Sequence, residues 1–205
     1  MMERFDQLQV GVLALQGDYG LHLRQLQGLG APGRLVRLPA DLEGLDALIL
    51  PGGESTTMEV LIDRFGLRQP LTAFARTRPI YGTCAGMILL AGGIEDNRAG
   101  IKPLGLIDID VVRNGYGRQV FSFEETLSMA LSDGPEPVRA AFIRAPKVTR
   151  TGPSVQTLSV YRDSPVLVRS SNILAASFHA ELDGSANLLR YFLTKFLSDT
   201  GRPDV

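Results

Sequence analysis

The chain has 205 residues, with 21 basic side chains against 22 acidic ones, a formal net charge of -1 and one cysteine. This length suits one substantial domain, and the balanced charge excludes an electrostatic preference for nucleic acid or for an anionic membrane. A single cysteine excludes an internal disulfide, and no apolar run approaches the length of a membrane span. We therefore expect a cytoplasmic globular protein that keeps a free thiol.

The first half of the chain alternates segments typical of buried strands with segments typical of helices. The expected strands cover residues 10–15, 34–38, 45–50 and 79–83. The expected helices cover residues 22–29, 55–65, 70–76 and 85–90, and Ser55 or Thr56 is expected to cap the second of them. This alternation predicts a three-layer α/β sandwich, flavodoxin-like in its winding, whose mainly parallel sheet binds ligands at the carboxyl ends of its strands.

The second half of the chain consists mainly of strand-like segments with short connections. The expected strands cover residues 106–113, 138–144, 155–161, 166–170 and 173–177, and an amphipathic helix follows at 187–197. We expect these strands to extend the same sheet in a mixed or antiparallel way. The whole chain, residues 1–205, then forms a single domain that ends in a frayed tail at 198–205.

Cys84 stands between Gly82 and Gly86, where the expected strand at 79–83 gives way to a helix. Small residues beside a nucleophile let the chain make the sharp turn that exposes one side chain at a strand end. The start of the helix also favours a thiolate, because the helix dipole is positive there. Taken alone, a cysteine in apolar surroundings is more often a small core residue, so a second feature has to decide.

That second feature is the pair His179 and Glu181. A histidine can take the proton of a thiol and deliver it to a leaving amine, while a carboxylate holds the imidazole in one tautomer. If residues 177–181 are extended, the two side chains project to the same side. With Cys84 they predict a catalytic triad for acyl transfer, whereas His22, on a leucine-patterned helix, is expected to be structural or exposed.

Acyl transfer also needs hydrogen-bond donors for the oxyanion. Gly52 and Gly53 follow one strand and precede a helix, and Ala85 begins the helix after Cys84. Backbone amides in these places can face a developing negative charge, so we predict an oxyanion hole made by these three residues. An ordinary strand-to-helix turn is the alternative interpretation of the glycine pair.

Together these motifs resemble the triad-type (class I) glutamine amidotransferases, and among them the glutaminase subunits of pyridoxal 5'-phosphate synthase. The resemblance runs from about residue 10 to residue 182. Beyond Gly-x-Cys-x-Gly and His-x-Glu, its narrower marks are the segments at residues 15–17, 50–57, 81–86, 113–119, 122–124 and 142–146. Several motifs in one order are more specific than any of them alone.

The resemblance implies that L-glutamine is hydrolysed to L-glutamate and ammonia through a thioester on Cys84, without a cofactor or a metal. It implies that the substrate is held by Gly53, Glu54, Ser55, Arg113, Ile143 and Arg144. It also implies a hetero-oligomer in which ammonia passes to a barrel-fold synthase subunit that makes pyridoxal 5'-phosphate from a pentose phosphate and a triose phosphate. In that family, docking of the glutaminase on the synthase subunit orders the oxyanion hole of the glutaminase. The residues alone would make the two arginines solvated charges at strand ends.

One position departs from the family pattern, because Ala180 stands where proline is usual between the histidine and the glutamate. Proline would bias His179 toward an extended backbone, so we expect a small loss of preorganisation and an intact triad. Three other functions stay open. They are a glutaminase subunit for a different acceptor synthase, a non-enzymatic stress protein of similar fold, and a degenerate partner that only binds a synthase. The 113–119 and 142–146 segments argue against the first, and the complete triad argues against the other two.

Overall fold

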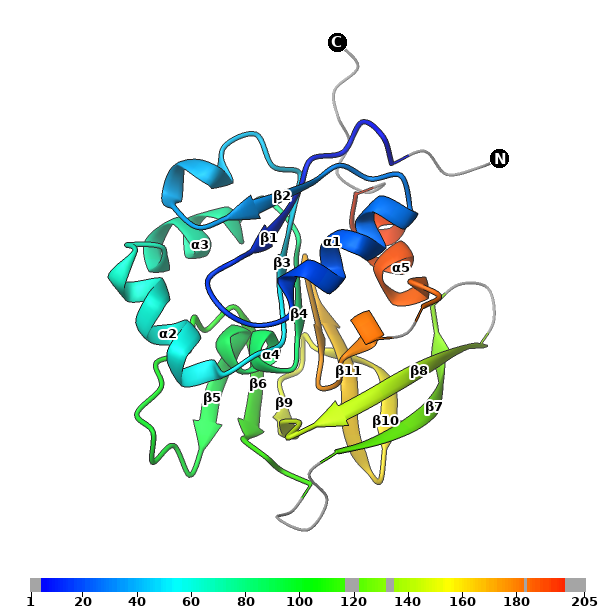
Figure 1. Ribbon diagram of the computed structural model, residues 1–205. Coiled ribbons are helices and arrows are strands. Elements are labelled where there is room, and N and C mark those ends of the chain that lie inside the picture. The colour runs from blue at the N-terminus through cyan, green and yellow to red at the C-terminus, as the bar shows by residue number, and fades with distance from the viewer. Residues whose placement is uncertain (1–4, 117–121, 132–134, 183, 198–205) are drawn as a thin grey trace.

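The computed structural model describes residues 5–116, 122–131, 135–182 and 184–197. A seven-stranded sheet runs through the molecule in the order β10-β11-β12-β4-β3-β1-β2 (Figure 1). Its strands are β1 (Val10–Leu13), β2 (Gly33–Val36), β3 (Ala47–Leu50), β4 (Ile80–Thr83), β10 (Gln156–Tyr161), β11 (Ser164–Ser170) and β12 (Ile173–Ala176). Neighbours from β12 to β2 pair in parallel, and β11 and β10 add an antiparallel edge. The mainly parallel mixed sheet predicted from the sequence is confirmed.

Helices cover both faces of this sheet and complete three layers. Helices α1 (Tyr19–Gly28) and α5 (Asn187–Leu197) lie on one face, and α2 (Ser55–Arg64), α3 (Arg68–Phe74) and α4 (Ala85–Leu90) lie on the other (Figure 1). Strand β3 shows how the sequence produces this. Ala47 and Ile49 enter the core beneath α1 and α5, while Leu48 and Leu50 enter the core beneath α2 to α4. A continuous apolar run is what a strand covered on both faces requires.

The second half of the chain forms two further sheets that were not expected. Strands β5 (Ala91–Glu95), β6 (Ile107–Val112) and β9 (Lys147–Thr151) make one sheet, and β7 (Ser122–Ala130) and β8 (Pro135–Ile143) make a hairpin. The prediction that residues 106–113 and 138–144 extend the main sheet is therefore wrong. Strand β6 alternates buried and less buried residues, which suits a sheet covered on one face, whereas β4 is buried throughout. The expected tail at 198–205 and part of the 113–119 motif lie outside the described residues.

Helix α2 begins at Ser55, and its cap is Glu54 rather than Ser55 or Thr56. The Glu54 carboxylate accepts a hydrogen bond from the Thr57 N–H at 2.7 Å, so it satisfies an amide that has no partner within the helix. The expected cap was wrong by one residue because the longer glutamate side chain reaches the same amide. Among the helices of the described ranges, none is both long and apolar enough to cross a membrane.

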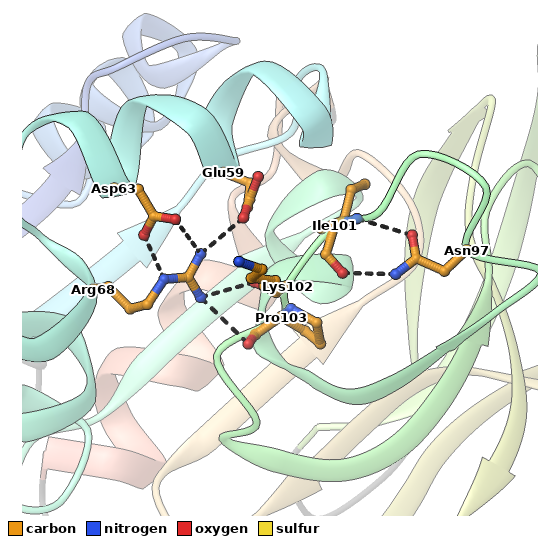
Figure 2. A network of polar contacts seen from close by, with 7 residues as sticks. All are labelled: Glu59, Asp63, Arg68, Asn97, Ile101, Lys102 and Pro103. Carbon is orange, nitrogen blue, oxygen red and sulfur yellow. Dashed lines mark hydrogen bonds and ion pairs between the residues drawn. The ribbon is translucent and has the colours of Figure 1, made fainter.

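The segment between β5 and β6, which carries no motif, is held by its own side chains and by α3. Asn97 closes a turn by donating to the Ile101 carbonyl at 2.7 Å and accepting from the Ile101 N–H at 3.0 Å (Figure 2). Arg68 of α3 then connects this segment to the helices through hydrogen bonds to backbone carbonyls.

Arg68 lies at the start of α3. It pairs with Glu59 and Asp63 of α2 and donates to the carbonyls of Lys102 and Pro103, at 2.8 and 3.5 Å (Figure 2). We call these five residues the Arg68 cluster. It joins two helices and a loop on the face of the sheet covered by α2, α3 and α4.

Candidate active site

The carboxyl ends of four neighbouring strands meet at one edge of the main sheet. In spatial order, β12, β4, β3 and β1 lead into the segments that hold His179, Cys84, Gly53 and Gln16. The winding reverses between β1 and β3, because β1 continues into β2 on one side while β3 continues into β4 on the other. A reversal of this kind leaves a crevice at the strand ends, which is where the sequence predicted the site.

Cys84 forms a strained turn between β4 and α4. Its φ of 49° and ψ of -105° lie outside the regions that non-glycine residues favour. The flanking glycines do not share this strain, since neither Gly82 nor Gly86 has a left-handed φ. A Cβ on Gly82 would lie 2.8 Å from the carbonyl carbon of Gly86, and one on Gly86 would lie 2.1 Å from the Leu50 carbonyl oxygen. The glycines therefore let α4 approach the sheet closely, and the cysteine itself carries the unusual backbone.

His179 is fixed at the end of β12 by contacts on both sides. Its N–H donates to the Ala141 carbonyl of β8 at 2.8 Å, and the next carbonyl, that of Ala180, accepts from the Gln25 side chain of α1 at 3.2 Å. Ala180 is buried at 5% exposure. The backbone next to the histidine is thus held by two neighbouring elements although proline is missing.

The His179 Nδ1 atom lies 2.7 Å from Glu181 Oε1. Glu181 is in a short 3₁₀ turn, η2 (Ala180–Leu182), so the extended backbone expected at 177–181 is wrong at its end. The turn, and not the alternation of a strand, brings the carboxylate back to the imidazole. The predicted contact is present through a different local geometry.

Burial and charge set the protonation state of this pair. Burial lowers the pKa of His179, but hydrogen bonds and charge interactions with Cys84 and Glu181 outweigh it and raise that pKa to about 10. Burial raises the pKa of Glu181, and its contacts with His179 and His22 lower it below its ordinary value. His179 is therefore held in its protonated form between the Cys84 side chain and a buried carboxylate.

A cavity of 270 Å³ opens beside Cys84 and His179. All the residues predicted to hold a substrate line it: Gly53, Glu54, Ser55, Arg113, Ile143 and Arg144. The predicted oxyanion residues Gly52 and Ala85 are buried next to lining residues and do not themselves line it, and Glu181 lies behind His179. Arg144 has a φ of 47° and the lining residue Asn114 has a φ of 53°, so two non-glycine residues of the site besides Cys84 have a left-handed φ.

The cavity has five lining residues that sequence reasoning did not assign to the site: Gln16, Gly17, Asp18, Ile88 and Asn114. Three of them shape the glycine turn. Gln16 Oε1 accepts from the Glu54 N–H at 2.7 Å, and the Asp18 N–H donates to the Gly52 carbonyl at 3.1 Å. Gly17 has a φ of 95°, and a Cβ there would lie 1.9 Å from the Gly52 oxygen. The motif at residues 15–17 was the signal in the sequence that could have pointed to these residues. Their role in the site follows only from their contacts with the loop at Gly52 and Glu54.

Two oppositely charged side chains, Arg113 and Glu54, lie next to each other in the wall of the cavity. Arg113 donates to Glu54 Oε1 at 3.3 Å. Burial raises the pKa of Glu54, but hydrogen bonds from Thr56 and Thr57 together lower it by more, so the net pKa is about 2. The carboxylate is therefore ionised at neutral pH. Arg113 was expected from the residues alone to be a solvated charge, and the structure places it in the cavity with a partner. A paired anion and cation suit a ligand that carries both charges.

Asp18, His179 and Glu181 each offer an atom within 4.8 Å of the others, a spacing that could hold a metal ion. The Nδ1 atom of His179 is already bonded to Glu181 at 2.7 Å, and its ring faces the thiol. A metal ligated there would compete with both contacts.

The sequence is similar to curated proteins over most of its length. A model of the SNO glutamine amidotransferase family matches residues 12–198. The chain is 48% identical over 188 residues to the pyridoxal 5'-phosphate synthase subunit PdxT of Dehalococcoides mccartyi, covering 91% of this chain and 96% of that protein. It is 50% identical over 191 residues to the protein of the same name from Mycolicibacterium vanbaalenii, covering 90% and 96%.

Solved structures agree with this assignment. A crystal structure of a glutamine amidotransferase superposes with a TM-score of 0.84 at 44% identity, covering 90% of this chain and 97% of that one. A putative GMP synthase protein from Thermoplasma acidophilum superposes with a TM-score of 0.68 over 94% and 95% of the chains, and at 17% identity it shows a shared fold alone. The match at residues 12–198 and the curated relatives show that the chain belongs to the SNO glutamine amidotransferase family.

Proposed function

We propose that this chain is the glutaminase subunit of a pyridoxal 5'-phosphate synthase, which hydrolyses L-glutamine and supplies the ammonia to a synthase subunit. The observation that carries the proposal is the placement of Cys84 and His179 at one cavity, with Glu181 behind His179 at 2.7 Å from its Nδ1 atom. The curated relatives named as this synthase subunit support the choice of acceptor pathway.

The cavity suits the amino-acid end of glutamine. Arg113 can hold the α-carboxylate with charge-assisted hydrogen bonds, and the ionised Glu54 beside it can accept from the α-ammonium. Ser55, Gly53 and the strand end at Ile143 and Arg144 complete the binding wall in this proposal. The side-chain amide of glutamine then extends toward Cys84.

The first half of the reaction transfers the acyl group to sulfur. The Cys84 thiolate adds to the amide carbon, and the carbonyl oxygen takes up the negative charge. The His179 imidazolium gives its proton to the amide nitrogen, the C–N bond breaks, and ammonia leaves a thioester behind. Glu181 keeps the imidazole in the tautomer that can serve both steps.

The second half releases glutamate. Neutral His179 takes a proton from a water molecule, which attacks the thioester carbon. The C–S bond breaks, glutamate leaves, and the thiolate and imidazolium are restored. No cofactor or metal takes part in this scheme.

We assign the oxyanion hole to the amides of Gly52, Gly53 and Ala85. Ala85 begins α4, so its N–H belongs to the first turn, where amides have no partner within the helix. The Gly52 carbonyl is held by the Asp18 N–H, which fixes the orientation of the peptide that follows it. Docking of a barrel-fold synthase subunit would complete this hole, as the resemblance to the family implies.

Two further parts of the proposal concern organisation. Residues 1–205 form one glutaminase domain, and it works as a hetero-oligomer with the synthase subunit. A cytoplasmic location is favoured by a single cysteine that stays free.

Ammonia release from glutamine, measured with and without the synthase subunit, tests the proposal. Cys84→Ala should abolish the release of ammonia from glutamine in the complex, because no thioester can form. With glutamine as the nitrogen source, the same variant should no longer support formation of pyridoxal 5'-phosphate. With an added ammonium salt as the nitrogen source, formation should continue. Equal ammonia release by wild type and variant in the complex would overturn the mechanism. Glutamine hydrolysis without any support of pyridoxal 5'-phosphate formation would point to another acceptor.

A further inference from the structure

The second histidine of the chain, His22, lies directly behind the triad. It is on α1, and its side chain is fully buried, although the sequence alone also allowed an exposed position. Its Nε2 atom is 3.7 Å from Glu181 Oε2, while His179 Nδ1 is 2.7 Å from Glu181 Oε1. The buried carboxylate therefore stands between two imidazole rings, and each of its oxygen atoms faces one of them.

The same nitrogen atom also contacts the nucleophile's strand. His22 Nε2 lies 3.3 Å from the Oγ1 atom of Thr83, a buried residue that immediately precedes Cys84. The ring meets Tyr81 of β4 edge-on, with ring centroids 6.1 Å apart at 88°. One side chain of α1 thus touches both the acid of the triad and the end of β4, which places the cysteine.

Burial favours a neutral His22. It lowers the pKa of His22, and nearby His179 lowers it further, while the charges of Glu181 and Asp18 raise it less than burial lowers it. Tyr81 and Thr83 face the ring from β4 and are uncharged at neutral pH. A neutral imidazole has one N–H to donate.

The contacts decide which nitrogen carries that hydrogen. With the hydrogen on Nε2, the ring donates toward Glu181 Oε2 and Thr83 Oγ1. With the hydrogen on Nδ1, a lone pair would face the carboxylate, and the N–H would point to a place where no partner lies among the described residues. A buried N–H without a partner is costly, so the Nε2–H tautomer is favoured.

We propose that His22 is a positioning residue of the triad, whose Nε2–H holds the Oε2 atom of Glu181 and so keeps Oε1 on His179. The inference rests on the hydrolytic function proposed above. The 3.7 Å separation is longer than a hydrogen bond, so the N–H acts on the carboxylate as a dipole facing a buried charge. His22 does not line the cavity, so it acts on the chemistry and leaves substrate contacts unchanged.

Two substitutions separate the donor from the bulk of the ring. His22→Phe fills the space without a donor, and His22→Gln places an amide N–H near the position of Nε2. In the complex, His22→Phe should lower kcat for glutamine about 10-fold with KM within about twofold, since the N–H dipole that faces the buried Glu181 carboxylate is lost. His22→Gln should recover most of this loss.

A matched control is Leu26→Ala, because Leu26 is also fully buried on α1 and packs into the core, and its aliphatic side chain can donate no hydrogen bond to the triad. It should lower the melting temperature at least as much as His22→Phe and leave kcat per folded molecule unchanged. A merely structural role of His22 would make the two variants behave alike.

The rate of Cys84 alkylation by iodoacetamide at pH 7 gives a readout that needs no glutamine, and Cys84 is the only cysteine. The rate constant should fall about 10-fold in His22→Phe and return toward wild type in His22→Gln. An unchanged rate constant with wild-type kcat in His22→Phe would overturn the proposal, as would an equal loss of rate in Leu26→Ala. Absence of Cys84-dependent ammonia release in the wild type would instead refute the proposed function.

Discussion

The His179–Glu181 pair at the carboxyl edge of the sheet and the Arg68 cluster between α2 and α3 both join a cation to a carboxylate at close range. They differ in burial, because the side chains of His179 and Glu181 are 6% and 0% exposed, whereas those of Arg68 and Asp63 are 28% and 45% exposed. They also differ in chemistry. Imidazole can give up its proton near neutral pH, and a guanidinium group cannot.

The difference explains what each region can do. A buried pair with one titratable partner responds to any change in its surroundings, since charge interactions are strong away from water. A half-exposed arginine with several carboxylate and carbonyl partners joins elements of the fold, and each contact adds little. The first region is therefore expected to control activity, and the second to control stability modestly.

The largest effect is expected from Glu181→Gln. The amide keeps the shape of the side chain but has no charge to stabilise the imidazolium, so kcat for glutamine in the complex should fall about 10³–10⁴-fold. KM should change little, because Glu181 does not line the cavity. Steady-state ammonia release measures both constants.

The matched control is Glu59→Gln in the Arg68 cluster, which makes the same chemical change in another buried acid that pairs with a cation. Its kcat should remain at the wild-type value. A comparable loss of kcat in both variants would show that the distinction between the two regions is wrong.

A smaller effect concerns stability and pH. The pKa of His179 is raised from 6.5 to about 10 in the folded chain, so between these values the folded state binds more protons than the unfolded state. Stability from this group is fully present below pH 6.5 and is lost as the pH rises toward 10. Urea unfolding of wild type and His179→Gln at pH 6.5 and 9.5 should show the wild-type advantage shrinking with pH. An advantage that grows with pH would contradict the charge state assigned to the triad.

The sequence predicted the parallel half of the fold well because its strands are buried on both faces. The helices expected at 85–90 and 187–197 have the same bounds as α4 and α5, and the four early strands are all present. Continuous apolar runs and the glycines after them depend on local sequence alone. The motifs after the strand ends named residues that line one cavity.

What the sequence did not predict depends on contacts between distant segments. The alternating pattern of residues 106–113 indicates a strand but does not choose its partner, and β6 pairs outside the main sheet. His22 shares a helix face with Leu26, four residues later, so its burial could have been inferred. Its contact with Glu181 could not, because that needs the packing of α1 against η2.

The smallest effect is expected from Arg68→Ala, which removes the centre of the Arg68 cluster. Because the Arg68 side chain is 28% exposed and the Asp63 side chain 45% exposed, water screens much of this pairing. Unfolding should therefore become easier by only about 1 kcal/mol, which lowers the melting temperature by roughly 2–4 °C. Arg98→Ala serves as the control, since Arg98 pairs with Asp96 while 85% exposed and should cost nothing measurable. Neither variant should change kcat. A drop of more than about 10 °C for Arg68→Ala would mean that the cluster is as essential to the fold as the buried pair is to catalysis.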